Sequence, residues 1–332
     1  MEKSESNRKL WEINEKIYKQ KKELDEELKS IEIEKEQLKI EAESIKIKNQ
    51  KLWEQSKLIH KEKERINKLR LEIEGKHKEI TDSIQYAQRL QTAILPQKKN
   101  IDNFLSNWFI LFKPKDLVSG DFYWFEESEK KIMFAAADAT GHGVPGAMVS
   151  VICNNGLNRS VNEFKLEDPG EILTKTKEII IESFEKSSKE IQDGMDIALV
   201  SMNKYPNKDG SREVSYAGAY NPLWIFRKQS LTIEEIKADR QPVGKYQFEK
   251  PFTTHKRIIN KGDRIYLFSD GYESQFGGEK GKKLKASNFK KYLSSLNNES
   301  MDNQKLLLDK FFKKWLGNYE QIDDVVIFGM EN

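Results

Sequence analysis

The chain has 332 residues, and its 57 Lys and Arg nearly balance its 54 Asp and Glu, so the formal net charge is only +3. This balance offers no broad cationic surface and argues against nucleic acid as a partner. A single Cys153, no apolar run near the roughly 20 residues that span a bilayer and a charged N-terminus predict a cytoplasmic protein with no membrane partner.

Residues 1–80 show the pattern of a coiled coil. The first 95 residues contain no proline and one glycine, Gly75, and every seventh residue from 10 to 80 is Leu or Ile. A strict period of seven predicts a left-handed supercoil with a partner helix, here a homodimer about 130 Å long. The other seam position is mostly polar, with residues such as Asn14, Lys21 and Lys35. Such a seam is either a weak, shiftable dimer contact or a solvated spacer without regulatory meaning.

Residues 81–96 are predicted to form a connector helix. A wider apolar face is expected to dock on the following domain, and Pro96 to end the helix. The residues of this face are Ile84, Ala87, Leu90, Ala93, Ile94 and Leu95.

Residues 97–332 have the composition of a globular domain. Strands are predicted at 107–113, 121–125, 131–137, 196–202, 213–217, 222–228, 263–269 and 323–329. Helices are predicted at 145–160, 169–186, 287–296 and 303–316. Strands grouped by short turns, with helices in separate blocks, favour an α+β fold with antiparallel sheets over a βαβ repeat.

Four short segments place an aspartate where a strand-like apolar run starts or stops. They are Val-Ser-Gly-Asp121-Phe, Asp138-Ala-Thr-Gly-His-Gly, Ser-Asp270-Gly-Tyr-Glu and Asp323-Asp324-Val-Val. If a sheet brings these ends together, the crowded carboxylates take up protons unless cations hold them ionised. Hard oxygen ligands suit Mg²⁺ or Mn²⁺. The pattern therefore predicts a two-metal hydrolytic site.

Some of these positions have alternative interpretations. The turn after Asp138 either binds a ligand or is an ordinary strand-to-helix turn. Of Asp323 and Asp324, only one is expected in the site, because adjacent side chains on a strand point to opposite faces. Asp196 either helps to hold an additional metal or simply starts a strand.

Taken in this order, the motifs resemble those of PPM-type (type 2C-like) metal-dependent serine/threonine protein phosphatases, and the bacterial SpoIIE/RsbU-like branch in particular. Ala-Gln-Arg-Leu-Gln-Thr-Ala-Ile-Leu-Pro (87–96), Asp-Gly-Met-Asp-Ile-Ala (193–198), Ala-Gly-Ala-Tyr-Asn-Pro-Leu (217–223) and Gln-Phe-Gly-Gly (275–278) carry the resemblance further. The resemblance covers roughly residues 80–330, and the predicted coiled coil of residues 1–80 lies outside it. The resemblance implies a four-layer sandwich of two antiparallel sheets flanked by helices, here preceded by the long coiled-coil helix.

The resemblance also implies roles for individual residues. Asp138 would bridge two Mn²⁺ or Mg²⁺ ions, with the Ala139 carbonyl as a backbone ligand. Asp121, also a residue of the metal site, would hold or orient a metal-bound water, and Asp270 and Asp323 would complete the first metal position. No arginine matches the phosphate-binding arginine of animal relatives, and His142 is either a general acid or a residue that stabilises the turn.

The implied reaction is in-line attack by a metal-activated water on a phosphoserine or phosphothreonine of a protein. In this branch that protein is often a STAS-type anti-sigma-factor antagonist. A nucleotidyl cyclase would require a base pocket and paired-subunit motifs, which the sequence lacks. The remaining alternative is a coiled-coil signalling scaffold whose phosphatase-like domain is inactive.

Overall fold

The computed structural model describes residues 2–185, 193–247 and 250–332. The chain divides into two compact units, Met1–Glu79 and Ile80–Asn332. Helix α1 (Glu2–Ile94) supplies all described residues of the first unit and continues into the second. Within the described ranges, no helix combines the length and apolar character needed to cross a membrane.

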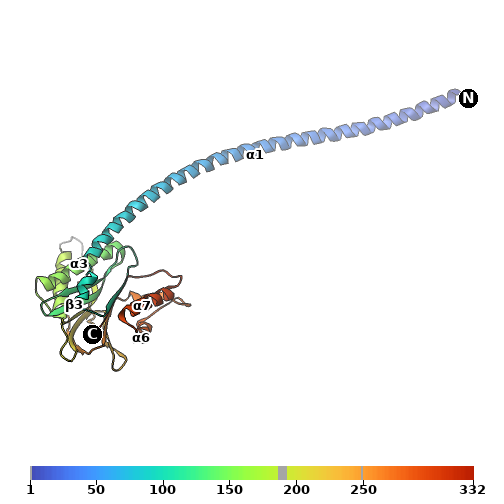
Figure 1. The fold of residues 1–332 in the computed structure, drawn as a ribbon. Coiled ribbons are helices and arrows are strands. Elements are labelled where there is room, and N and C mark those ends of the chain that lie inside the picture. The colour runs from blue at the N-terminus through green and yellow to red at the C-terminus, as the bar shows by residue number, and fades with distance from the viewer. Residues whose placement is uncertain (1, 186–192, 248–249) are drawn as a thin grey trace. The chain divides into compact units, whose positions relative to one another are not determined.

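The second unit contains two sheets in which all named strands pair antiparallel (Figure 1). Sheet A runs in the order β1 (Trp108–Lys113), β13 (Val325–Glu331), β10 (Arg264–Phe268), β6 (Leu223–Arg227) and β7 (Thr232–Ile236). Sheet B runs in the order β2 (Asp121–Glu127), β3 (Lys131–Ala139), β4 (Gly194–Asn203), β5 (Arg212–Ala219) and β9 (His255–Ile259), with β8 (Val243–Gly244) beside β4. A small hairpin joins β11 (Phe276–Gly277) to β12 (Lys282–Lys283).

Helices cover the outer faces of both sheets. The remaining helices are α2 (Lys98–Asp102), α3 (Gly143–Asn162), α4 (Pro169–Glu185), α5 (Gly271–Ser274), α6 (Ala286–Ser295) and α7 (Met301–Leu316). One core joins α3 and α4 to sheet B, a second lies between the sheets, and a third joins sheet A to α6 and α7. Side chains alternate along β3, where Met133 faces the helices and Phe134 the other sheet. The predicted α+β, four-layer sandwich after a long helix is confirmed.

The predicted elements of this domain are present, with ends shifted by no more than two residues. Position 186, the predicted end of the second helix, lies outside the described residues. The short elements α2, α5, β8, β11 and β12 and the strands β7 and β9 were not predicted. Both of these strands lie at sheet edges and are rich in charge (Thr-Ile-Glu-Glu-Ile and His-Lys-Arg-Ile-Ile), which is typical of edge strands and hides the strand pattern.

The connector docks through part of the predicted face. Leu95 is buried and Ile84 and Ala87 are half-buried, whereas the other three predicted residues, Leu90, Ala93 and Ile94, are exposed. The centre of the contact is the buried Gln91, whose amide donates to the Ser119 carbonyl oxygen and accepts from the Ser119 N–H. A polar side chain with its hydrogen bonds satisfied can be buried in such a contact, and apolar periodicity alone does not reveal it.

Replacing Phe134 by Ala should lower the free energy of unfolding by about 3–5 kcal/mol, because the substitution leaves a cavity between the sheets. Phe134 is fully buried and stacks on Phe328 with ring centroids 4.8 Å apart. Urea denaturation followed by tryptophan fluorescence measures the change. Tyr205→Ala, at a side chain 77% exposed, is the control and should change stability by less than about 0.5 kcal/mol.

Candidate metal centre

Three carboxylates line up across one end of sheet B. Asp121 opens β2 and pairs with Asp138 near the end of β3, and Asp138 pairs with Asp196 near the start of β4. Neighbouring strands lie about 4.8 Å apart. The strand register therefore brings together three aspartates from segments far apart in the sequence.

Sheet A adds Asp270 and Asp323 to this end of the sandwich. The Ser269 hydroxyl donates to Asp121 Oδ2 and accepts from the Val326 N–H at 3.1 Å, so it ties the ends of β10 and β13 to β2. Gly271 lies against the chain that leads into β13, since a Cβ there would be 1.9 Å from the Asp324 carbonyl oxygen. Only a glycine permits this close approach of the segments that carry Asp270 and Asp323.

Burial and mutual repulsion disfavour the charged forms of these carboxyl groups. Burial raises the pKa of Asp138 to about 8, with further contributions from Asp270, Asp323 and Asp196. Burial, followed by the charge of Asp138, raises the pKa of Asp121 well above its ordinary value. Burial and then Asp270 raise the pKa of Asp196 to about 7. Without a cation these carboxyl groups therefore tend to hold protons, whereas a bound cation would stabilise their ionised forms.

Asp323 and Asp324 have separate roles. Asp324 is 2% exposed, and its carboxylate accepts the Lys115 N–H at 2.7 Å and the Gly120 N–H at 2.8 Å. Asp323 is half-buried, and burial and then the charge of Asp270 raise its pKa despite the hydrogen bond from the Asp324 N–H. Both residues precede β13, so the alternation of side chains along a strand does not separate them. They differ because the Asp324 carboxylate is held by hydrogen bonds to the loop before β2.

The turn after Asp138 is built on a close backbone contact. Gly141 has φ +87°, and its carbonyl oxygen would lie 2.1 Å from a Cβ at Gly146 and 2.3 Å from one at Gly120. Ala139 ends β3 and is buried, and its N–H donates to the Gly120 carbonyl oxygen at 3.3 Å. The turn thereby holds the end of β3 against the start of β2.

His142 lies on the surface at the start of α3. Its Nδ1 is 3.3 Å from Asp116 Oδ2 and its Nε2 is 3.5 Å from Lys115 Nζ. Its side chain makes no capping hydrogen bond to the helix. Neither contact involves one of the clustered aspartates. Among the described residues, the polar contacts of the imidazole are with the loop before β2.

Two residues that organise the site were not predicted from the sequence. Ser269 directly precedes Asp270. A hydroxyl side chain at the end of a buried strand is the feature of the sequence that could have indicated its hydrogen bond to Asp121. Gln275 is fully buried. Its side-chain amide donates to the Glu320 carbonyl oxygen and accepts from the Ile322 N–H. These hydrogen bonds fix the chain just before Asp323. Its long-range partners have no counterpart in the local sequence.

The donor set fits a hard divalent cation, because it consists of carboxylate oxygens with a backbone carbonyl close by. The described residues hold no group of three or more His, Cys, Asp or Glu side chains already arranged around one ion position. The clustered aspartates interact electrostatically with one another.

Asp324→Ala should lower the free energy of unfolding by about 2–4 kcal/mol, because two backbone N–H groups would lose their charged acceptor. Asp323→Ala should leave stability unchanged or raise it, because it removes a carboxylate from a repulsive cluster. Urea denaturation in a chelating buffer compares the two variants. A larger loss for Asp323→Ala would contradict the division of roles.

A protein-family model matches most of the second unit. The family model described as "Stage II sporulation protein E (SpoIIE)" matches residues 128–331, more than half of the chain. A comparison with curated protein sequences found no match.

Solved structures with the same fold are similar over most of the second unit. The SiaA-PP2C domain of Pseudomonas aeruginosa is 26% identical, with a TM-score of 0.68 over 77% of this chain and 98% of that one. The PP2C phosphatase domain with a regulatory fragment of SpoIIE from Bacillus subtilis is 19% identical, with a TM-score of 0.53 over 68% and 63%. The RsbU and RsbW domains of Rv1364c from Mycobacterium tuberculosis are 16% identical, with a TM-score of 0.53 over 69% and 60%. The chain therefore belongs to the SpoIIE family of PP2C-like phosphatase domains.

Proposed function

We propose that this chain is a metal-dependent protein serine/threonine phosphatase of bacterial signalling. The observation that carries the proposal is the convergence of Asp121, Asp138, Asp270 and Asp323 at one end of the sandwich, in a chain of the SpoIIE family. Two similar structures are PP2C domains, which supports hydrolysis of a phosphate ester.

In this proposal the carboxylates hold two divalent cations, Mn²⁺ or Mg²⁺. Asp138, Asp270 and Asp323 are the side-chain ligands, with the Ala139 carbonyl as a backbone ligand and Asp196 as a candidate for an additional ion. When bound, the cations would neutralise phosphoryl charge and lower the pKa of water. Asp121, held by the Ser269 hydroxyl, orients the water that attacks the phosphorus atom.

The proposed substrate is a phosphorylated protein. A STAS-type anti-sigma-factor antagonist is the candidate, on the resemblance to the RsbU-like branch, and an RsbU domain is among the similar structures. The buried Cys153 lies in the core between α3 and sheet B, where burial raises the pKa of its thiol. It therefore lacks the setting of a nucleophile, and direct attack by water is the proposed route.

Asp138→Asn should abolish metal-dependent hydrolysis of p-nitrophenyl phosphate. Loss of several kcal/mol of transition-state stabilisation corresponds to a fall of about 10³-fold in kcat/KM. The assay compares the wild type with Mn²⁺, with Mg²⁺ and with EDTA, and EDTA should remove activity. Asp302→Asn, the same chemical change on the exposed surface of α7, is the control and should keep wild-type activity.

Inactivity of the folded wild type with either metal, together with no metal binding by calorimetry, would contradict the phosphatase proposal. That result would support the alternative of a non-catalytic coiled-coil scaffold. Activity that survives EDTA would also contradict the metal-dependent mechanism.

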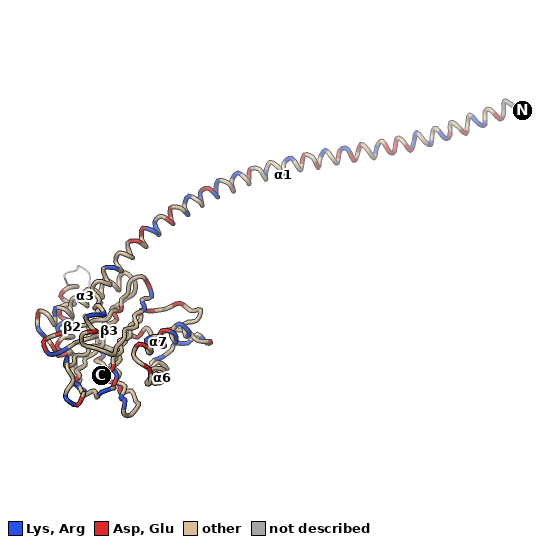
Figure 2. The backbone as a smooth tube through the Cα atoms, in the orientation of Figure 1, with Lys and Arg blue, Asp and Glu red and all other residues tan. Residues whose placement is uncertain are grey.

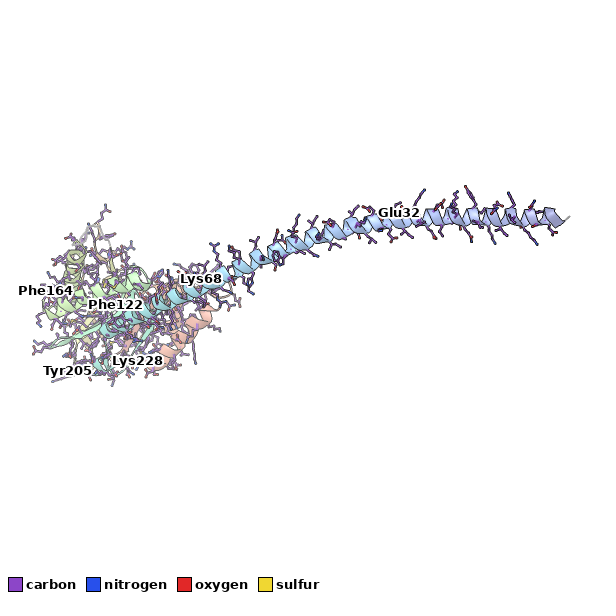
Figure 3. All side chains as sticks on the ribbon, turned by 90° about the horizontal axis from the view of Figure 1, so that it is seen from above. Glu32, Lys68, Phe122, Phe164, Tyr205 and Lys228 are labelled. Carbon is purple, nitrogen blue, oxygen red and sulfur yellow. The ribbon has the colours of Figure 1, made fainter. Side chains whose placement is uncertain are left out.

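We further propose that α1 dimerises and thereby regulates the phosphatase domain. Seam residues of the first unit are exposed, for example Leu24 at 60%, Leu38 at 59% and Leu52 at 61%. Figure 3 shows the side chains of this helix, including Glu32 and Lys68, projecting from its surface. A regular stripe of uncovered Leu and Ile is expected to pair with a second helix.

Ile59→Lys with Ile66→Lys should convert a dimer into a monomer, because each seam side chain contributes about 1.5–3 kcal/mol when it is buried. Leu58→Lys with Leu71→Lys is the matched control, since these residues have similar exposure but lie outside the seam. Sedimentation velocity measures the oligomeric state. Equal behaviour of the two double variants would contradict pairing through the seam.

A further inference from the structure

The hairpin of β11 and β12 carries a concentrated positive charge. Residues 279–285 read Glu-Lys-Gly-Lys-Lys-Leu-Lys, which is four lysines and one glutamate, so seven residues carry a net charge of +3. The whole chain of 332 residues has the same formal net charge. Along α1, by contrast, charges of both signs alternate (Figure 2). We call residues 276–285 the lysine hairpin.

The lysine hairpin has a defined conformation. Gly277 pairs with Lys282, and the Gly278 N–H donates to the Trp315 carbonyl oxygen at 2.7 Å. Leu284 is buried at 1% exposure and anchors the second strand in the core under α6 and α7. The lysines therefore extend from a scaffold fixed on both of its strands.

This hairpin adjoins the aspartate cluster. The Leu284 N–H donates to the Gln275 carbonyl oxygen at 3.0 Å, and the Lys285 N–H donates to that of Glu273 at 2.8 Å. Glu273 lies in α5 and Gln275 directly follows it, and α5 begins directly after Asp270. Glu273 lies within electrostatic reach of both Asp270 and Lys283. The lysines thus lie on the side of the site that is formed by α5.

The ammonium groups of the hairpin are available to a partner. Lys280, Lys282, Lys283 and Lys285 are exposed, and within the described ranges no carboxylate forms an ion pair with them. Lys290 of the neighbouring α6 differs, since it is paired with Glu235. Lys285 also has a φ of +70°, an unfavourable backbone conformation for a residue with a side chain.

We propose that the lysine hairpin binds an acidic segment next to the phosphorylated residue of the protein substrate. The inference rests on the proposed phosphatase function and names the kind of substrate. Exposed lysines beside the aspartate cluster attract acidic residues of a substrate and orient the phosphorylated residue toward the site. Binding through exposed charges should weaken as salt concentration rises.

The test uses two fluorescent phosphoserine peptides, one with four flanking Asp or Glu residues and one with Ser in those positions. Fluorescence anisotropy gives the Kd of each for the full chain carrying Asp138→Asn, so that binding is read without turnover. Adding Lys280→Glu, Lys282→Glu and Lys283→Glu should raise the Kd of the acidic peptide about tenfold or more at low salt. The Kd of the neutral peptide should change far less.

The matched control reverses the same number of charges at the opposite end of the sandwich. Lys130, Lys208 and Lys261 lie in the turns β2–β3, β4–β5 and β9–β10, and their triple change to Glu should leave the preference for the acidic peptide intact. An unchanged ratio of the two Kd values in the hairpin variant would overturn the inference. So would binding of the hairpin to phosphatidylserine vesicles without any preference between the peptides.

Failure of this inference and failure of the phosphatase proposal are distinguishable. The anisotropy ratio tests the hairpin whether or not the chain hydrolyses phosphate esters. Metal-dependent hydrolysis of p-nitrophenyl phosphate, which has no acidic flank, tests the phosphatase site alone.

Discussion

Repulsion among carboxylates is the constraint on which the functional end of this molecule depends. Two like charges about 4 Å apart repel by about 4 kcal/mol at an effective dielectric constant of 20. Asp121, Asp138 and Asp196 are nevertheless held on neighbouring strands by the register of sheet B. The fold must therefore supply enough packing and hydrogen bonding elsewhere to hold them together. Burial, followed by the charges of neighbouring aspartates, raises the pKa values of all three groups.

The two sheets supply that stabilisation through contacts between them. Phe134 and Phe328 stack across the inner core, and the Ser269 hydroxyl connects the end of sheet A to Asp121 of sheet B. Asp324 accepts two backbone N–H groups of the loop before β2. These contacts fix the ends of β2, β10 and β13 relative to one another, so a cation would meet oxygen ligands whose backbone positions are already set.

Charge is distributed differently in the two units. In α1 it forms short-range pairs, such as Arg70 with Glu74 at 2.7 Å, which solubilise a helix without creating a field of one sign. In the second unit a group of aspartates lies at the site, and the lysines of residues 280–285 lie in a hairpin that is hydrogen-bonded to the segment after Asp270. This separation of charge is the basis of the proposed binding of an acidic segment by the lysine hairpin.

The sequence by itself determined the long helix, the main strands and helices of the domain, and the aspartates at strand ends. These features are local, since heptad spacing, apolar runs and turn residues act within a few residues along the chain. The strand pattern alone indicated antiparallel sheets but not how they are layered. The family resemblance added the four-layer sandwich.

Only the tertiary structure decided which polar residues organise the site. The division between Asp323 and Asp324, the contact through Gln91 and the link from Ser269 to Asp121 all depend on partners at least 28 positions away in the sequence. Edge strands β7 and β9 likewise became strands because a neighbouring strand offered hydrogen bonds to charged segments. Local patterns fix which residues are apolar and where the chain turns, whereas long-range hydrogen bonds depend on how distant segments meet, and that is decided by folding as a whole.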